Sequence, residues 1–157
     1  MFDDIRFLEE LAMRAWPPEE VDEVDGWRLR WHRVASRRVN SVWPNAWGGK
    51  MPLALKLQRV EAFYFLRGQP VCYQICPAAL PAGLDQVLEA RGFEKKTETA
   101  VQVAKTAPRE AVSGREQPIE VTIFETLTEK WVEGYCLAQG ETLVQVPARW
   151  DALSRIE

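Results

Sequence analysis

Three residues ahead of an apolar helical pattern have the chemistry of an anion-binding loop. Gly48, Gly49 and Lys50 come directly before this pattern. Free backbone amides and an ammonium group at the start of a helix can cradle a phosphate. A Gly-Gly pair in this place is more often a flexible turn, because glycine adopts turn conformations at no steric cost. The loop predicts either a weak anion site or a plain turn, and the turn is the commoner of the two.

A carboxylate and a phenol lie three residues apart within the following helical pattern. Glu61 and Tyr64 would share nearly one face of a helix, so they are weak candidates for a catalytic base and phenol. Tyr64 also falls in the apolar stripe with Leu57 and Val60, which favours core packing. Lys56 and Glu61 are expected to face water.

Residues that bind metals are scarce. The chain has one histidine, His32, and three cysteines that form no Cys-x-x-Cys pair: Cys72, Cys76 and Cys136. This is little material for a zinc site, so no metal site is expected. His32 has no carboxylate partner visible in the sequence and is expected at a surface or edge. The nearby arginines are expected to line a solvated strand face: Arg28, Arg30, Arg33, Arg37 and Arg38.

Composition limits the functional class. A net charge of -3 argues against general nucleic-acid binding. No apolar run approaches the roughly 20 residues that span a membrane, and the N-terminus is acidic, so we expect a cytoplasmic protein without membrane contact. Two of the seven tryptophans, Trp43 and Trp47, flank Pro44. They indicate interior packing or, less often, an aromatic ligand cleft.

Hydrophobic periodicity predicts an α+β fold with a mixed, mostly antiparallel sheet and helices on both faces. Asp25-Gly26 is a turn signal. The predicted helices are 3–15, 51–67 and 82–91, and the predicted strands are 27–34, 38–43, 70–76 and 97–104. The predicted core comprises Trp27, Trp31, Leu53, Leu57, Val60, Ile75, Leu84, Val87 and Leu88.

A change in composition separates the rest of the chain from this predicted α+β unit. Residues 1–105 are the predicted lobe, and 106–117 are rich in charges and turn formers, as in a linker. Residues 118–157 read as a strand at 119–124 and two helices. About 40 residues in this order bury too little apolar surface alone. We therefore expect self-association, or docking on the first lobe or a second protein lobe.

Four blocks, in their order and spacing, resemble the N-terminal half of two-lobed proteins of the GNAT (N-acetyltransferase) superfamily. The blocks are Gly26–Arg30, Arg37–Pro44, Val60–Tyr64 and Leu84–Phe93. The resemblance covers about residues 5 to 105 and implies a divergent GNAT lobe. In such proteins the C-terminal lobe carries acetyl-CoA and the chemistry. Residues 118–157 look like the truncated start of that second lobe.

The resemblance also implies where function would lie. The family's pyrophosphate loop has the pattern Gln/Arg-x-x-Gly-x-Gly/Ala. Here Asn45 replaces Gln/Arg, Gly48 matches the middle glycine, and Lys50 replaces the last small residue. By resemblance the acetyl-CoA site would be Asn45, Gly48, Gly49 and Lys50. The family's tyrosine acid falls on Leu88, which cannot donate a proton.

Two functions follow from this comparison. The first is an acetyltransferase-related lobe that lacks its own catalytic machinery and binds a partner. The alternative is an acetyl-CoA-dependent N-acetyltransferase acting on an unknown amine, with the cofactor in a cleft between strands 38–43 and 70–76. A ligand-binding domain with its site at Trp43 and Trp47 is a third possibility.

Overall fold

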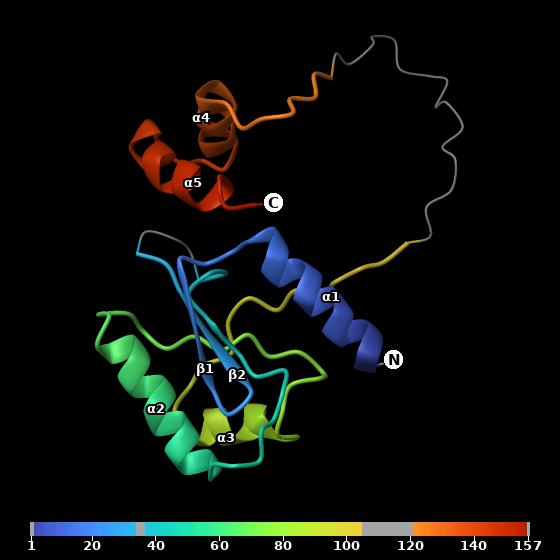
Figure 1. Ribbon diagram of the computed structural model, residues 1–157, viewed down its shortest axis with the longest axis vertical. Helices are drawn as coiled ribbons and strands as arrows, with labels where there is room; N and C mark the ends of the chain where they lie inside the picture. Colours follow the sequence, from blue (N-terminus) through green and yellow to red (C-terminus); the bar gives the residue numbers. More distant parts are fainter. Residues whose placement is uncertain (1, 34–36, 105–120, 157) are drawn as a thin grey trace.

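The computed structural model describes residues 2–33, 37–104 and 121–156. Five α-helices, three strands and one short 3-10 helix make up this part (Figure 1). Their bounds are α1 Phe2–Ala15, β1 Glu20–Val24, β2 Trp27–Trp31, β3 Val42–Trp43, α2 Leu53–Phe65, α3 Leu84–Ala90, α4 Glu129–Ala138, η1 Leu143–Gln145 and α5 Val146–Leu153.

The three strands form one antiparallel sheet in the order β1-β2-β3. β1 and β2 make a hairpin that closes at Val24 and Trp27. The two loop residues, Asp25 and Gly26, both have positive φ, 47° and 91°, as in the type I′ turn that suits hairpin twist. β1 was not predicted, because its sequence, Glu-Val-Asp-Glu-Val, does not alternate between apolar and polar residues. In the structure only Val24 of this strand is buried.

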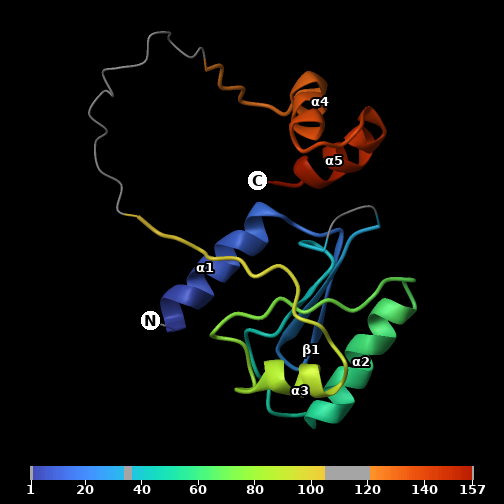
Figure 2. The same ribbon diagram turned by 180° about the vertical axis from the view of Figure 1, so that it is seen from behind.

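Helices cover both faces of the sheet. On one face Leu29 is buried in a core with residues of α2, and Tyr64 of that helix donates a hydrogen bond to the Arg30 carbonyl at 2.9 Å. On the other face Arg28 pairs with Glu10 of α1 at 2.7 Å. Figures 1 and 2 show α1 and α2 on opposite sides of the sheet. The predicted α+β class, with helices on both faces, is confirmed.

The sheet is smaller than predicted. Residues 70–76 contribute one parallel bridge, between Val42 and Tyr73. Pro44 follows β3 directly and has no N–H with which to extend the ladder. Residues 97–104 form no strand, and Val101 is 69% exposed. Residues 121–124, the described part of the predicted strand 119–124, form none either. Alternation with a period of two indicates an extended segment with two different faces, but it does not show whether another strand is available to pair with it.

The main core confirms the helix faces. Five of the predicted core residues are buried: Trp27, Leu57, Val60, Leu84 and Leu88. The other four pack around them and are only partly buried: Trp31, Leu53, Ile75 and Val87. Tyr64 also lies in this core.

α4, η1 and α5 form a separate small cluster, built on Val132, Cys136 and Val146. Thr128 caps the N-terminus of α4, and its hydroxyl accepts a hydrogen bond from the Trp131 amide at 3.3 Å. α4 and α5 lie where the sequence predicts two C-terminal helices, whereas the predicted linker, 106–117, lies outside the described residues. None of the described helices has the length and apolar character needed to cross a membrane.

Leucines on opposite faces of α2 provide a stability test. Leu57 is 2% exposed and Leu55 is 43% exposed. We expect Leu57→Ala to lower the free energy of unfolding by about 2–5 kcal/mol, since it leaves a cavity in the core. Leu55→Ala should cost under about 1 kcal/mol, as surface changes do. Urea denaturation measures both; equal losses would contradict the assigned helix face.

Candidate functional site

The glycine-rich loop ahead of α2 is occupied by a side chain of the protein itself. The Gly48 amide donates to the Asp25 carbonyl at 2.9 Å, and the Lys50 amide donates to Asp25 Oδ1 at 3.1 Å. Asp25 belongs to the hairpin turn between β1 and β2. Its carboxylate therefore takes the place that an anion would have among the loop amides.

The same contact explains why residue 48 is glycine. A Cβ on Gly48 would overlap Asp25 Oδ1, and a Cβ on Gly26 would meet the Gly48 amide nitrogen at 3.0 Å. The hairpin turn and the loop thus approach each other backbone to backbone. Glycine is needed at this position for internal packing, without any bound phosphate.

Lys56 completes this contact from α2. Its ammonium lies 3.1 Å from Asp25 Oδ2 and donates to the Asp25 carbonyl at 2.7 Å. It also lies over the ring of Trp47, at 3.6 Å, and over that of Trp27, at 4.8 Å. The Lys56 side chain is fully buried, so its predicted solvent-facing position is wrong. Cation–π contacts and a paired carboxylate make such burial tolerable.

Asp25 is held in its ionised form. Desolvation acts to raise its pKa, but hydrogen bonds from Lys56 and from the Lys50 and Met51 amides outweigh it and lower the pKa below the ordinary value. A carboxylate that accepts several hydrogen bonds and faces a cation favours its charged form. Asp25 is thus a fixed negative charge inside the loop.

The remaining loop residues from the sequence analysis point elsewhere. The Asn45 side chain accepts a hydrogen bond from the Cys76 thiol at 3.5 Å. Lys50 is exposed, and Gly49 has a φ of +70°, which glycine adopts freely. The structure thus brings the four predicted residues into one loop, but does not direct them toward a common point.

Glu61 and Tyr64 share α2 but not an environment. Glu61 pairs with Arg91 at 2.6 Å at the surface, while Tyr64 is buried, with its hydroxyl on the Arg30 carbonyl. Burial raises the pKa of Tyr64 well above its usual range. The core-packing interpretation of Tyr64 fits this placement. Leu88, at the position of the family's acid, is itself a core residue.

Tyr73 is a buried phenol that sequence reasoning did not single out. Its hydroxyl is buried and has no hydrogen-bond partner in the described part of the chain. Burial raises its pKa, and the charge of Glu61 raises it further. Alternation placed Tyr73 on a strand but gave no signal of this depth.

The space expected for the cofactor is crossed by backbone hydrogen bonds. The Val42 amide donates to the Cys72 carbonyl at 2.8 Å, and the Gln74 amide donates to the Val42 carbonyl at 2.9 Å. These bonds join β3 to residues 70–76. The two segments are therefore not splayed apart at Val42.

A hollow of about 400 Å³ lies beside the loop, at the two tryptophans for which an aromatic cleft was the less favoured prediction. Trp43 and Trp47 line it together with Arg28 and Glu10. These last two residues are paired with each other, at 2.7 Å. The hollow therefore offers aromatic walls and a charge pair that is already neutralised.

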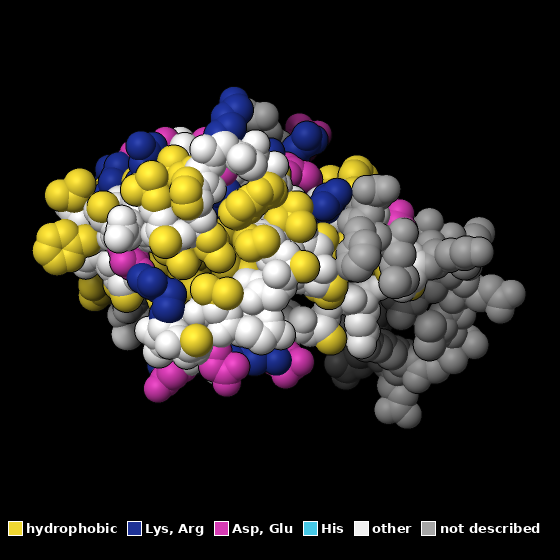
Figure 3. Space-filling view, turned by 90° about the horizontal axis from the view of Figure 1, so that it is seen from below, with side chains coloured by type: hydrophobic (Ala, Val, Ile, Leu, Met, Phe, Trp, Pro, Cys, Tyr) yellow, Lys and Arg dark blue, Asp and Glu magenta, His cyan; other side chains and the backbone are white. Residues whose placement is uncertain are grey.

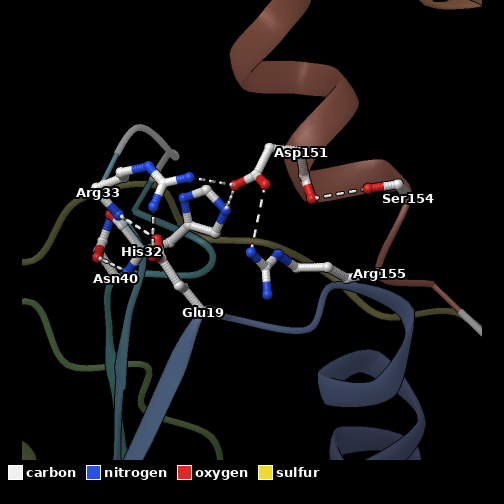
Figure 4. Close-up of polar contacts among 7 residues, drawn as sticks. All are labelled: Glu19, His32, Arg33, Asn40, Asp151, Ser154 and Arg155. Carbon is white, nitrogen blue, oxygen red and sulfur yellow. Dashed lines mark hydrogen bonds and ion pairs between the residues drawn. The ribbon is translucent and has the colours of Figure 1, made fainter.

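A second polar cluster surrounds His32 (Figure 4). His32 is fully buried, and its Nε2 lies 3.1 Å from Asp151 Oδ2 of α5, so its expected surface position is wrong. Arg30, also expected on a solvated face, is buried beneath the Trp43 ring. The partner of His32 lies 119 residues further along the chain, so no local pattern could have indicated it.

One ligand-type atom each from Glu19, His32 and Asp151 lie within 4.8 Å of one another. Arg33 lies 2.6 Å from Glu19 and 3.6 Å from Asp151, and Arg155 lies 3.3 Å from Asp151. These guanidinium groups already balance both carboxylates. The arrangement is an ion-pair cluster, and the lack of a metal site stays a prediction.

Two lysines near the loop, Lys56, which is buried, and Lys50, which is exposed, allow a test of how much the buried charge pair stabilises the fold. We expect Lys56→Met to lower the melting temperature clearly, because it leaves the Asp25 carboxylate without its cation. Lys50→Met should change it little. The Asp25 contribution should be present above the ordinary aspartate pKa, about 3.9, and be lost as the pH falls through the lower folded value. Thermal scans from pH 2 to 7 measure this; equal melting temperatures for the two variants would contradict it.

Comparisons with known proteins fit this fold. Residues 3–150 match the family described as "Probable histone acetyltransferase Rv0428c C-terminal". The chain is 38% identical over 96 residues to the "Uncharacterized N-acetyltransferase YobR" of Bacillus subtilis (strain 168). That match covers 61% of this chain but 37% of the relative. No solved structure matches the chain significantly. The chain belongs to the Rv0428c C-terminal family and is related to GNAT-type acetyltransferases.

Proposed function

We propose that this protein is an acetyltransferase-related GNAT lobe that lacks its own catalytic machinery and acts by binding a partner. One observation carries the proposal: Asp25 occupies the loop that would hold the pyrophosphate of acetyl-CoA, with its carboxylate on the Lys50 amide and its backbone carbonyl on the Gly48 amide. Two further arguments support it: the site is unfavourable for a pyrophosphate, and the family's proton donor is missing.

Pyrophosphate binding is opposed by charge and by geometry. A phosphate entering the loop would meet a carboxylate kept ionised by Lys56. Like charges in a partly desolvated site repel strongly. Moving Asp25 out of the way would leave the buried Lys56 ammonium without its anion, which is costly. Acetyl-CoA binding by this chain is therefore at best weak.

Proton donation is also lacking where the family would have it. Leu88 is buried and carries no proton to give. Glu61 is paired with Arg91, and the Tyr64 hydroxyl is used by the core. General-acid help is typically worth about 10² to 10⁴ in rate. Any acetyl transfer by this chain alone should be correspondingly slow.

Partner binding is supported by exposed apolar surface. Apolar side chains gather on the face of the lobe that lies away from α4 and α5 (Figure 3). Phe65 and Leu66, at the end of α2, are about four-fifths exposed. Large apolar patches on a soluble domain mark interaction sites. We propose a second protein lobe or a second copy of this chain as partner, in the cytoplasm.

The alternative is an acetyl-CoA-dependent N-acetyltransferase acting on an unknown amine. The N-acetyltransferase name of the Bacillus relative favours it. The buried Tyr73 phenol, kept protonated by its raised pKa, would be the proton donor in that case. The chain spans 37% of the length of that relative, so the activity of the whole protein is a separate proposal.

Calorimetry with acetyl-CoA tests the proposal. We expect no saturable binding by the wild-type chain at micromolar concentration. Asp25→Ser, which removes the carboxylate from the Lys50 amide, should bind more tightly than wild type if the carboxylate is what blocks the loop. Wild-type binding in the low micromolar range that is lost in Lys50→Glu would contradict the proposal and favour the enzyme.

A further inference from the structure

We propose that His32, with Glu19 and Arg33 beside it, forms a socket on the first lobe that binds α5 and holds the C-terminal helix pair on that lobe. The helix pair means α4, η1 and α5, residues 129–153. This inference does not depend on whether the chain binds acetyl-CoA.

The contact joins two parts of the fold that are distant in sequence. His32 follows β2, and Asp151 lies in the last turn of α5; their Nε2 and Oδ2 atoms are 3.1 Å apart. Arg33 approaches the same carboxylate oxygen at 3.6 Å. Figure 4 shows α5 directing Asp151 into the residues around His32.

The socket is built by the first lobe itself. The His32 amide donates to Asn40 Oδ1 at 2.8 Å, and Asn40 Nδ2 donates to the His32 carbonyl at 3.0 Å. Both backbone groups of His32 are therefore fixed by a residue of the same lobe. The backbone from which the imidazole projects is therefore set by the lobe and does not rely on α5.

Charges across the contact are complementary. The lobe contributes Glu19 and Arg33, which pair at 2.6 Å. α5 contributes Asp151, and Arg155 just beyond the helix lies 3.3 Å from it. With a neutral imidazole, two carboxylates face two guanidinium groups. Complementary charge of this kind fixes register and orientation more than it adds raw affinity.

The helix pair needs such a contact. Its own cluster has three buried side chains, Val132, Cys136 and Val146, with two partly buried residues beside them. A core of this size rarely stabilises a domain alone. Ala152, next to Asp151, is also buried, and it lies outside that cluster. The contact that the structure gives the helix pair with the lobe is the polar one at His32 and Arg33.

Proton binding at His32 should weaken the contact. Burial lowers the pKa of His32, although Asp151 and Glu19 act to raise it; Arg155 and Arg33 lower it further. Undocking would expose the imidazole to water and so move its pKa back toward the ordinary value, about 6.5. The docked form therefore binds a proton less readily than the undocked form. Docking should be complete above about pH 6.5 and weaken as the pH falls through the lower docked value.

Nitrogen-15 relaxation of the full chain at pH 7.5 tests the socket. We expect backbone amides of the helix pair and of β2 to report the same rotational correlation time. Asp151→Asn should shorten the correlation time of the helix pair alone, while far-ultraviolet circular dichroism stays unchanged. Asp85→Asn, an exposed carboxylate on α3, is the matched control and should leave the two times equal.

Four results would overturn the inference. The first is a helix pair that tumbles independently in the wild type. The second is a helix pair that stays docked in Asp151→Asn. The third is a helix pair that docks only after Zn²⁺ is added. The fourth is docking that requires dimer formation, seen as a doubled mass in light scattering, because the socket would then bind a second copy. A wild-type correlation time that is equal in both parts at pH 7.5 but not at pH 5 supports the role of His32.

Discussion

The buried pairing of Asp25 with Lys56 is the interaction on which the first lobe depends. It joins the β1–β2 turn, the glycine-rich loop and the first turn of α2 at one point. Lys56 brings Trp27 and Trp47 to the same point through its contacts with their rings. A buried ammonium is stable only with a close anion and further polar contacts, and Asp25 supplies both its carboxylate and its carbonyl.

This constraint has a direct consequence for function. In a GNAT cofactor loop, backbone amides and glycines serve a phosphate. Here Gly48 lets the chain approach Asp25, and the amides of Gly48 and Lys50 serve that residue. The loop keeps a glycine pattern like that of the family but uses it inside the protein. A fold can retain its architecture while its site changes role, so family membership alone does not assign an activity.

The sequence pattern correctly predicted those elements that depend on residues close together in the chain. The stripe of Leu57 and Val60 places α2 correctly, and Asp25-Gly26 forms the expected turn. Pattern failed where a partner far along the chain decides the outcome. Lys56 and His32 read as surface residues because their partners, Asp25 and Asp151, lie 31 and 119 residues away. Residues 97–104 were predicted to be a strand from their alternation. They form none, because alternation does not show whether a neighbouring strand exists.

The state of Asp25 is the most direct test of the central claim, that a side chain of the protein fills the loop. Carboxyl carbon-13 shifts, followed by NMR as the pH is lowered, give its pKa. We expect a value below the ordinary 3.9 of aspartate, unchanged when acetyl-CoA is added in excess. An ordinary pKa, or a carboxyl shift that moves saturably with acetyl-CoA, would contradict the claim and return the loop to cofactor binding.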